Sequence, residues 1–377
     1  MAHDKQPGPA ELEAAGLYDP EVDDASEHLS LLEYLVGLGA TIDDLRGTNR
    51  GELPLLASTI ALWGDRERLT LAEVAATAGI EPALIARTWR AAGFPDPDPD
   101  PDVRTFLASD AEILAILSAG IEFLGEEVTI QMVRVLGAAA ARVADASVSA
   151  FVVNVLPQAV EHDPSGLELA RANAESMVLL DGVTRAFDTL LRHHIERGFR
   201  PLEATDAAPG IDLVRRSVGF ADLVDSTAWT QQRDLPALSQ ALTAFDSTAS
   251  EIVVERGGRV VKLIGDSVMF VANDPMTAAD IALSLVDAFA DHDLLPSVRT
   301  GVATGNVLAR DGDFSGAIVN LAARAVSIAR PSTLLVDRET RDALDGSTVY
   351  SCRTAGSFAL KGFAKRVPLS RVKRSDF

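Results

Sequence analysis

The sequence contains one cysteine, Cys352, among its 377 residues. A single cysteine excludes an intrachain disulfide, and this usage is typical of a reducing compartment. The N-terminal segment MAHDKQPGPAELEAAG lacks the apolar core of a secretory signal. No run approaches the roughly 18 consecutive apolar residues of a membrane span. We therefore expect a cytoplasmic protein without a membrane span.

Basic residues are scarce as well. Lysine and arginine total 34 against 55 aspartates and glutamates, which gives a formal net charge of −21. Such a charge argues against nucleic acid or an anionic membrane as the main partner, although a local basic pocket for phosphates is still allowed. The length suggests two or three domains, and 47% hydrophobic residues are enough for a substantial core.

Strand signals are rare in the first 200 residues. Apolar residues recur there at three- and four-residue spacing, which predicts helices over residues 28–39, 53–64, 111–125 and 129–144. The alanine-rich segment 136–156 is interrupted by Arg142 and Asp145, so we expect a buried helix. PDPDPDPD, residues 95–102, cannot continue a helix and predicts an exposed connection. Residues 1–200 are therefore expected to form an all-helical regulatory domain.

The pattern changes after a linker at residues 201–212, which contains Pro201, Pro209 and Gly210. Strands and helices alternate over residues 213–377. We expect a strand at 216–224, a helix at 234–257, a hairpin at 260–272, a helix at 275–292, a strand pair at 298–309 and a helix at 316–329. An antiparallel hairpin among βα units predicts a ferredoxin-like sandwich. The chain as a whole is thus expected to be of the α+β class.

Two aspartates fall where the second half could carry chemistry. Asp222 ends the first strand, and Asp266 occupies the turn of the hairpin VVKLIGDSVMFVA. Two carboxylates at one sheet edge repel each other unless a cation lies between them, and Mg²⁺ or Mn²⁺ carrying a polyphosphate suits such a pair. The alternative is that both are turn or N-cap residues, for which aspartate is favoured.

Lys262 is unusual in so apolar a hairpin. Alternation places it on the same face as Val260 and Ile264. If that face is buried, its ammonium group needs an acceptor; otherwise the side chain reaches solvent.

The segment ARDGDFSGAIVNLAARA, residues 309–325, resembles the start of an EF-hand loop. Ala322 stands where the loop needs a bidentate glutamate, so this interpretation fails. Asn320 and Arg324 are four residues apart and share a helix face. They indicate either a ligand-facing site or a structural salt bridge.

Together these stretches resemble the catalytic domain of class III adenylyl cyclases, from about Val214 to Leu369. The order and spacing of FADLVDST, VVKLIGDSVMF, DGDFSGAIVNLAAR and FALKGF carry the resemblance. It implies that Asp222 and Asp266 bind two divalent cations, Mg²⁺ or Mn²⁺. It also implies that Lys262 and Asp313 recognise adenine.

The same resemblance assigns the remaining positions. Asn320 and Arg324 correspond to the transition-state residues, Lys361 to a lysine that contacts the terminal phosphates, and Thr227 to the triphosphate loop. Residues 225–226 are Asp-Ser where many members have Gly-Phe, a departure within the phosphate loop.

The implied reaction converts ATP to 3′,5′-cyclic AMP and pyrophosphate. The ribose 3′-hydroxyl attacks the α-phosphate in line, assisted by two metal ions. A lysine donor and an aspartate acceptor match N1 and N6 of adenine and oppose guanine, so ATP is favoured over GTP. In this family the active sites form between two catalytic domains, which implies a homodimer because this chain carries both residue sets.

Residues 69–94 resemble a helix-turn-helix of the MerR type, with Gly79 near the turn. Its second helix offers only Arg87 and Arg90 before the acidic Pro-Asp tract, which favours a scaffold over DNA binding. The arrangement of a helical domain before one cyclase domain resembles soluble actinobacterial cyclases whose N-terminal domain restrains catalysis and responds to pH.

His193 and His194 titrate in the range that a pH sensor needs, although they also fit an exposed pair on a helix. A lipid-like ligand among the apolar helices is left open. Two other functions remain alternatives: a non-catalytic nucleotide sensor with a degenerate cyclase domain, and a DNA-binding regulator. The complete set of catalytic positions argues against the first.

Overall fold

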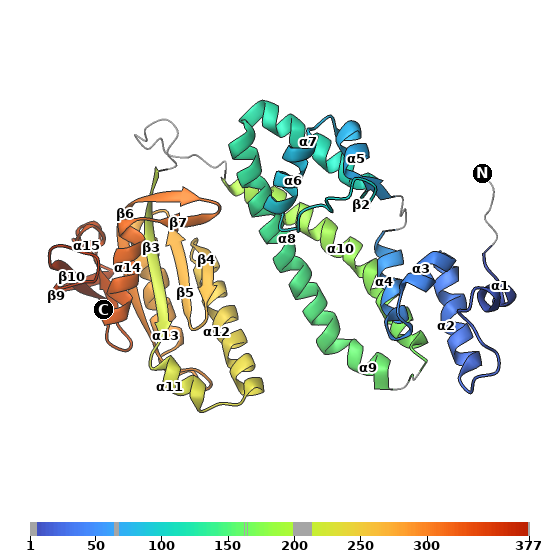
Figure 1. The fold of residues 1–377 in the computed structure, drawn as a ribbon. Helices are drawn as coiled ribbons and strands as arrows, with labels where there is room; N and C mark the ends of the chain where they lie inside the picture. Colours follow the sequence, from blue (N-terminus) through green and yellow to red (C-terminus); the bar gives the residue numbers. More distant parts are fainter. Residues whose placement is uncertain (1–5, 64–67, 162, 164, 199–212, 376–377) are drawn as a thin grey trace. The chain divides into compact units, whose positions relative to one another are not determined.

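A computed structural model describes residues 6–63, 68–161, 163, 165–198 and 213–375. The chain divides into two compact units, Met1–Pro201 and Leu202–Phe377 (Figure 1). Each unit has its own hydrophobic core.

The first unit begins with a small helical cluster. It comprises α1 (Pro9–Ala14), α2 (Ala25–Gly37), α3 (Ile42–Gly47), the 3₁₀ turn η1 (Arg50–Glu52) and α4 (Leu53–Leu62). Leu32, Leu35 and Ala57 are fully buried at its centre, and Ala170 of the later helix α10 completes the same cluster. The predicted periodicity of these helices is confirmed.

A helix-turn-helix follows. It consists of α5 (Leu71–Ala78) and α6 (Pro82–Ala91), and Gly79 ends α5 in the left-handed region with φ 68°. The strands β1 (Arg68–Thr70) and β2 (Arg104–Leu107) pair antiparallel beside these helices, and α7 (Ala108–Leu124) comes next. This ribbon was missed in an otherwise helical unit because each of its strands has only three or four residues. The Pro-Asp tract lies in the connection between α6 and β2, as predicted.

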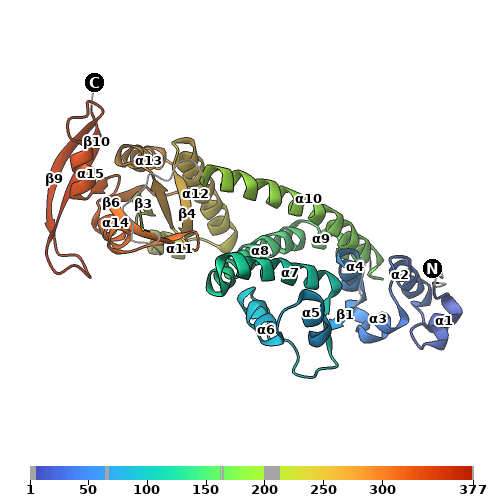
Figure 2. The ribbon, with the colours of Figure 1, turned by 90° about the horizontal axis from the view of Figure 1, so that it is seen from above.

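The long helices of this unit depart from expectation. They are α8 (Glu126–Asn154) and α10 (Leu167–Gly198), joined through the short α9 (Leu156–Glu161). In α8 only Thr129, Ile130 and Val133 are buried, so the prediction of a buried alanine-rich helix is wrong. The reason is packing: α8 contacts α6, α7 and α9, whereas α10 packs on α4 and α2 (Figure 2). Neither helix covers the length of the other.

Helix α8 also has the length and composition of a membrane span. Its best 18-residue window has a mean hydropathy of 1.4, and none of that window is buried. It is the one such helix in the described parts of the chain. Arg142 and Asp145 lie near its middle, where charges are costly in a bilayer.

The second unit is built on a mixed sheet of eight strands. Their order is β4 (Arg259–Ile264), β5 (Ser267–Ala272), β3 (Leu213–Leu223), β6 (Val298–Arg310), β8 (Leu334–Val336), β10 (Val367–Arg374) and β9 (Tyr350–Phe358), with β7 (Asp313–Ser315) paired to β6. Among the first four strands each runs antiparallel to its neighbour, in ferredoxin-like order. The predicted fold class is confirmed.

Helices cover both faces of this sheet. They are α11 (Ser226–Gln231), α12 (Leu235–Glu255), α13 (Pro275–Ala288), α14 (Ala317–Ile328) and α15 (Arg338–Leu344). One core joins α12 and α13 to Ala221 and Leu223, and the other joins α14 to Val218 and Phe220 (Figure 1). The alternation along β3 follows from the period of two in a strand.

One sequence prediction fails at residues 298–309, where a strand pair was expected. They form the single strand β6, which has 13 residues. A Cβ on Gly301 would lie 2.5 Å from the backbone nitrogen of Val326 in α14, and a Cβ on Gly305 would lie 2.7 Å from Ile318. These glycines therefore allow α14 to approach the strand and do not form a turn.

A second correction concerns the face of Lys262. The register of β4 against β5 shifts between Val260 and Lys262, so Val261 is an extra residue. Val260 pairs with Phe270, whereas Lys262 pairs with Met269 on the opposite face of the sheet. Lys262 therefore does not share a face with Val260; the bulge turns it towards the face covered by α14.

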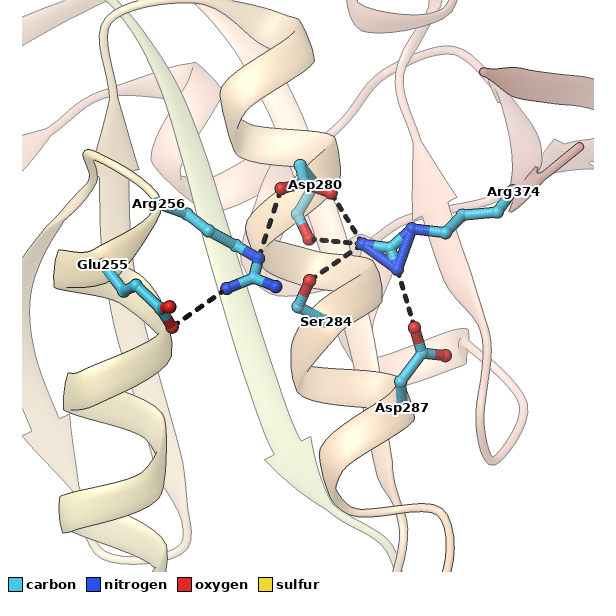
Figure 3. A network of polar contacts seen from close by, with 6 residues as sticks. All are labelled: Glu255, Arg256, Asp280, Ser284, Asp287 and Arg374. Carbon is cyan, nitrogen blue, oxygen red and sulfur yellow. Dashed lines mark hydrogen bonds and ion pairs between the residues drawn. The ribbon is translucent and has the colours of Figure 1, made fainter.

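The C-terminal strand is tied to α13 by a polar network (Figure 3). Arg374 of β10 donates to Asp287 at 2.7 Å, to Oδ1 of Asp280 at 2.6 Å and to Ser284 at 2.8 Å. Arg256, which follows α12, pairs with the same Asp280 at 3.2 Å. Asp280 thus links three elements on the side of the sheet away from α14.

Candidate active site

Three polar residues form a row across the central strands on the α14 face. Asp222 of β3 pairs in register with Ser267 of β5 on one side and with Arg299 of β6 on the other. Arg299 donates to Oδ2 of Asp222 from Nε at 2.9 Å and from Nη2 at 2.6 Å, and the Ser267 hydroxyl donates to Oδ1. Asp222 is half-buried, so these donors compensate its charge where water is restricted.

Asp266 lies beside this row. Its carbonyl oxygen accepts from the backbone N–H of Leu223 at 3.1 Å, which places the two aspartates next to each other at the end of the β3–β5 ladder. Within the described ranges its carboxylate has no hydrogen-bond or ion-pair partner. A free carboxylate beside a second one is an oxygen donor set of the kind that Mg²⁺ and Mn²⁺ prefer. The residues therefore fit a divalent cation site.

Lys262 and Asp313 meet directly, with Nζ of the lysine 2.5 Å from Oδ2 of the aspartate. Asp313 follows a two-residue turn at Asp311 and Gly312, whose φ values of 58° and 78° are those of a type I′ hairpin. Burial raises the pKa of Asp313, but the hydrogen bond from Lys262, the Phe314 N–H and the charges of Lys262 and Arg259 outweigh it and lower the pKa below its usual value. The lowered pKa favours the ionised form of Asp313.

Asn320 and Arg324 lie on one face of α14, and both are exposed. Lys361 is exposed in the turn between β9 and β10. In the described part of the chain none of these three side chains makes a hydrogen bond or ion pair. Thr227 belongs to α11, but its side chain lies outside the described residues.

The structure thus brings together two predicted pairs. Asp222 lies next to Asp266, and Lys262 contacts Asp313. Among the described residues, the side chains of Asn320, Arg324 and Lys361 make no hydrogen bond or ion pair with either pair. Asp225, at the departure from the common phosphate loop, has φ 53°. This is a left-handed conformation that glycine adopts freely and aspartate tolerates, so the backbone of the loop keeps the geometry of a glycine there.

Sequence reasoning missed the residues that support these pairs. Arg299 and Ser267 are revealed by strand register, since each lies opposite Asp222. Arg259 contacts the turn that carries Asp313. The sequence offered one signal for Arg259: it and Lys262 are the charged residues of the strand Arg259–Ile264, whose other residues are apolar.

The regulatory unit was predicted to titrate at His193 and His194. Both are exposed on α10, and Nδ1 of His193 lies 3.9 Å from Glu196. His28, which sequence reasoning did not select, is half-buried, and its Nε2 lies 3.2 Å from the carbonyl of Leu17. Burial, and then the charge of Arg50, lower the pKa of His28.

The second helix of the helix-turn-helix carries two arginines that pair with carboxylates. Arg87 pairs with Glu126 and Glu127 at the start of α8, and Arg90 pairs with Asp96 of the Pro-Asp tract at 2.8 Å. Both arginines therefore have acidic partners within the same unit.

Both units of the chain match families of known proteins. Residues 12–180 match the model of the adenylate cyclase regulatory domain, and residues 213–371 match that of the adenylate and guanylate cyclase catalytic domain. A Streptomyces coelicolor protein named adenylate cyclase is 34% identical over 292 residues, covering 76% of this chain and 74% of its own.

Two further relatives come from Mycobacterium tuberculosis. A protein described as uncharacterized is 34% identical over 355 residues, covering 93% of this chain and 90% of its own. A protein named pH-sensitive adenylate cyclase is 31% identical over 366 residues, covering 93% of this chain and 88% of its own. The similarity therefore extends through both units.

Proposed function

This chain belongs to the adenylate cyclases that carry an N-terminal regulatory domain before a class III catalytic domain, and on that basis we propose that it converts ATP to 3′,5′-cyclic AMP and pyrophosphate. Such an enzyme is a phosphorus–oxygen lyase. The observation that carries the choice of ATP is the direct contact between Lys262 and Asp313. A donor next to an acceptor matches N1 and the N6 amine of adenine, whereas guanine presents the opposite polarity at both places.

Asp222 and Asp266 would hold two divalent cations. When bound, Mg²⁺ or Mn²⁺ lowers the pKa of the ribose 3′-hydroxyl and holds the triphosphate. Without a metal ion, Arg299 compensates the charge of Asp222. If a cation replaced Arg299 as the partner of Asp222, the guanidinium would lie next to the polyphosphate. Asp222 would therefore have a positive partner in both states.

The residues of α14 would act on the reacting atoms. Arg324 donates to the α-phosphate oxygens, where negative charge grows as the 3′-oxygen bonds to phosphorus and the bond to pyrophosphate breaks. Asn320 orients the ribose, and Lys361 together with the loop of Thr227 contacts the terminal phosphates. Loss of one preorganised donor commonly slows such reactions by about 10²- to 10³-fold.

We assign these groups to a homodimer with two shared sites. One chain would supply the aspartates and the other Lys262, Asp313, Asn320 and Arg324. The absence of partners for Asn320 and Arg324 in the described chain supports this assignment. So do the exposed apolar side chains of α8 and α10, among them Val178 at 74%, Leu179 at 73% and Leu190 at 57% exposure. Apolar faces of this extent mark interaction surfaces.

The N-terminal unit would control catalysis. A relative similar over nearly the whole chain is named a pH-sensitive adenylate cyclase, and we extend that property to this chain, with His193 and His194 as titrating groups in a cytoplasmic enzyme. Replacing both histidines with residues of fixed charge should flatten the pH–activity profile of the full-length protein. An unchanged profile would remove them from the mechanism.

The test of the proposed activity is a product assay. Purified full-length protein with Mn²⁺ should form cyclic AMP and pyrophosphate from ATP, and form cyclic GMP from GTP far more slowly. The Arg324→Ala variant should lose at least about 10²-fold of this activity, whereas Arg330→Ala, just beyond α14, should keep it. A wild-type protein that binds ATP without turnover would favour the nucleotide sensor.

A further inference from the structure

Arg259 reaches from the edge strand β4 to the turn that displays Asp313. Its Nη1 donates to the carbonyl of Gly312 at 3.4 Å, and its guanidinium carbon lies 5.1 Å from the ring centroid of Phe314. Its charge also acts on Asp313 and helps to lower the pKa of that carboxyl. Arg259 thus contacts Gly312 and Phe314, the residues immediately before and after Asp313.

We propose that Arg259 is the positioning residue for base recognition, which holds the Asp313 turn at the distance from Lys262 that adenine requires. This inference rests on the proposed function of Lys262 and Asp313. It assigns Arg259 to substrate selectivity and gives it no contact with the reacting phosphate.

The need for such a residue follows from the topology. Among the described strands β7 pairs with β6, whereas β4 is at the edge of the sheet and pairs with β5. The Lys262–Asp313 ion pair and the contacts of Arg259 connect β4 with the turn through side chains. The described backbone ladders connect β4 with the turn only indirectly, through β5, β3 and β6.

Adenine binding would weaken the first of these links, the Lys262–Asp313 ion pair. The lysine ammonium must share its three donors between N1 and Asp313, and the carboxylate must also accept from the N6 amine, so the ion pair at 2.5 Å no longer holds the turn by itself. The contacts of Arg259 still join the strand and the turn when the base is bound. Arg259 also keeps a positive charge near Asp313 while Lys262 donates to the base. The Phe314 ring beneath it is buried in the core with α14, so this anchor is fixed.

The experiment compares Arg259→Met with Arg259→Lys in the full-length protein. We expect Arg259→Met to raise KM for ATP about tenfold and to reduce the preference for ATP over GTP in kcat/KM about tenfold, with a smaller change in kcat. Arg259→Lys keeps a cation over Phe314 and a donor for Gly312, so it should stay within about threefold of wild type. Arg330→Met, a matched loss of an exposed arginine in the same unit, should change neither constant.

Two results would overturn the inference. One is an unchanged base preference in Arg259→Met; the other is an equal fall in kcat in the methionine and lysine variants with KM unaltered. If Arg259→Met fails to fold, Arg259→Gln serves instead. Glutamine keeps an amide donor but removes the cation over Phe314, so this variant should still lose base preference. An inactive wild type would instead refute the proposed function. Loss of base preference in Asp313→Ala but not in Arg259→Met would refute this inference alone.

Discussion

Arg299 and Asp222 face each other across the β3–β6 ladder, and the guanidinium holds one carboxylate oxygen with two donors, at 2.9 Å and 2.6 Å. Its Nη1 also lies 3.3 Å from the carbonyl of Ser327 at the end of α14. The aspartate that would bind metal is therefore paired by its own chain, and a cation must compete with Arg299 for it.

The first prediction concerns this competition. Replacing Arg299 with methionine removes a positive charge next to two carboxylates, so Mn²⁺ should bind about tenfold more tightly in the absence of nucleotide. The signal of free Mn²⁺ in electron paramagnetic resonance measures this affinity directly. Arg330→Met is the control and should leave it unchanged. Equal affinities in wild type and Arg299→Met would show that Arg299 does not compete.

The second prediction concerns pH and the first unit. The pKa of His28 is lowered, first by burial and then by Arg50, so its contribution to stability is present above its unfolded-state pKa of about 6.5. That contribution is lost as the pH falls through and below this value. Thermal unfolding should therefore occur at lower temperature at about pH 5.5 than at about pH 7.5.

The variant His28→Gln keeps an amide donor for Leu17 and removes the titration. Its melting temperature should fall less between the two pH values than that of the wild type. His193→Gln is the control, because His193 is exposed and should leave the difference as it is. An identical fall in wild type and His28→Gln would exclude His28 as the origin.

The third prediction concerns the network of Figure 3. Arg374→Met removes the donors to Oδ1 of Asp280, to Ser284 and to Asp287, while Oδ2 of Asp280 keeps its ion pair with Arg256. The free energy of unfolding, measured by urea denaturation, should fall by about 1 kcal/mol, because water partly replaces the lost donors at these half-exposed side chains. Lys373→Met, the neighbouring exposed residue on β10, should change it little. KM for ATP should stay constant in both variants, since the network lies on the face of the sheet away from Asp222.

The fourth prediction concerns the exposed face of α10. Leu190→Glu places a charge within the apolar surface that a second copy would cover, so the variant should sediment as a monomer and lose cyclase activity. Arg185→Glu, on the same helix, introduces the same side chain at a polar position and should remain dimeric. Analytical ultracentrifugation separates the two outcomes. A Leu190→Glu variant that stays dimeric would place the interface elsewhere.

The sequence predicts most of the catalytic fold because its elements are set by local patterns. Periods of two and of three to four residues gave β3, β5, α12 and α13 in their observed positions. The errors come from contacts between distant segments. A strand pair was expected at residues 298–309, but Gly301 allows α14 to approach the single strand β6. The bulge at Val261 reverses the face of Lys262. Neither feature has a signature within its own segment.

In the site and in the regulatory unit too, features set by local sequence could be predicted, and features set by contacts between distant segments could not. Asp222, Asp266, Lys262 and Asp313 could be identified because their motifs resemble those of class III cyclases. The structure places Asp222 next to Asp266 and Lys262 in contact with Asp313. Arg299 and Arg259 could not be identified, because their roles depend on which strand lies opposite. The exposure of α8 also has no local signal. The sequence pattern of an apolar helix is the same whether the helix is covered by its own chain or by a second copy.

The measurement that tests the shared-site account most directly is complementation between two inactive variants. Asp222→Ala removes a metal ligand and Arg324→Ala removes a transition-state donor, so each protein alone should form almost no cyclic AMP. Mixed in equal amounts and allowed to exchange subunits, they should recover up to about a quarter of wild-type activity, because half of the dimers would be mixed and each would hold one intact site. No recovery, with mixed dimers demonstrated by sedimentation of tagged chains, would contradict the account.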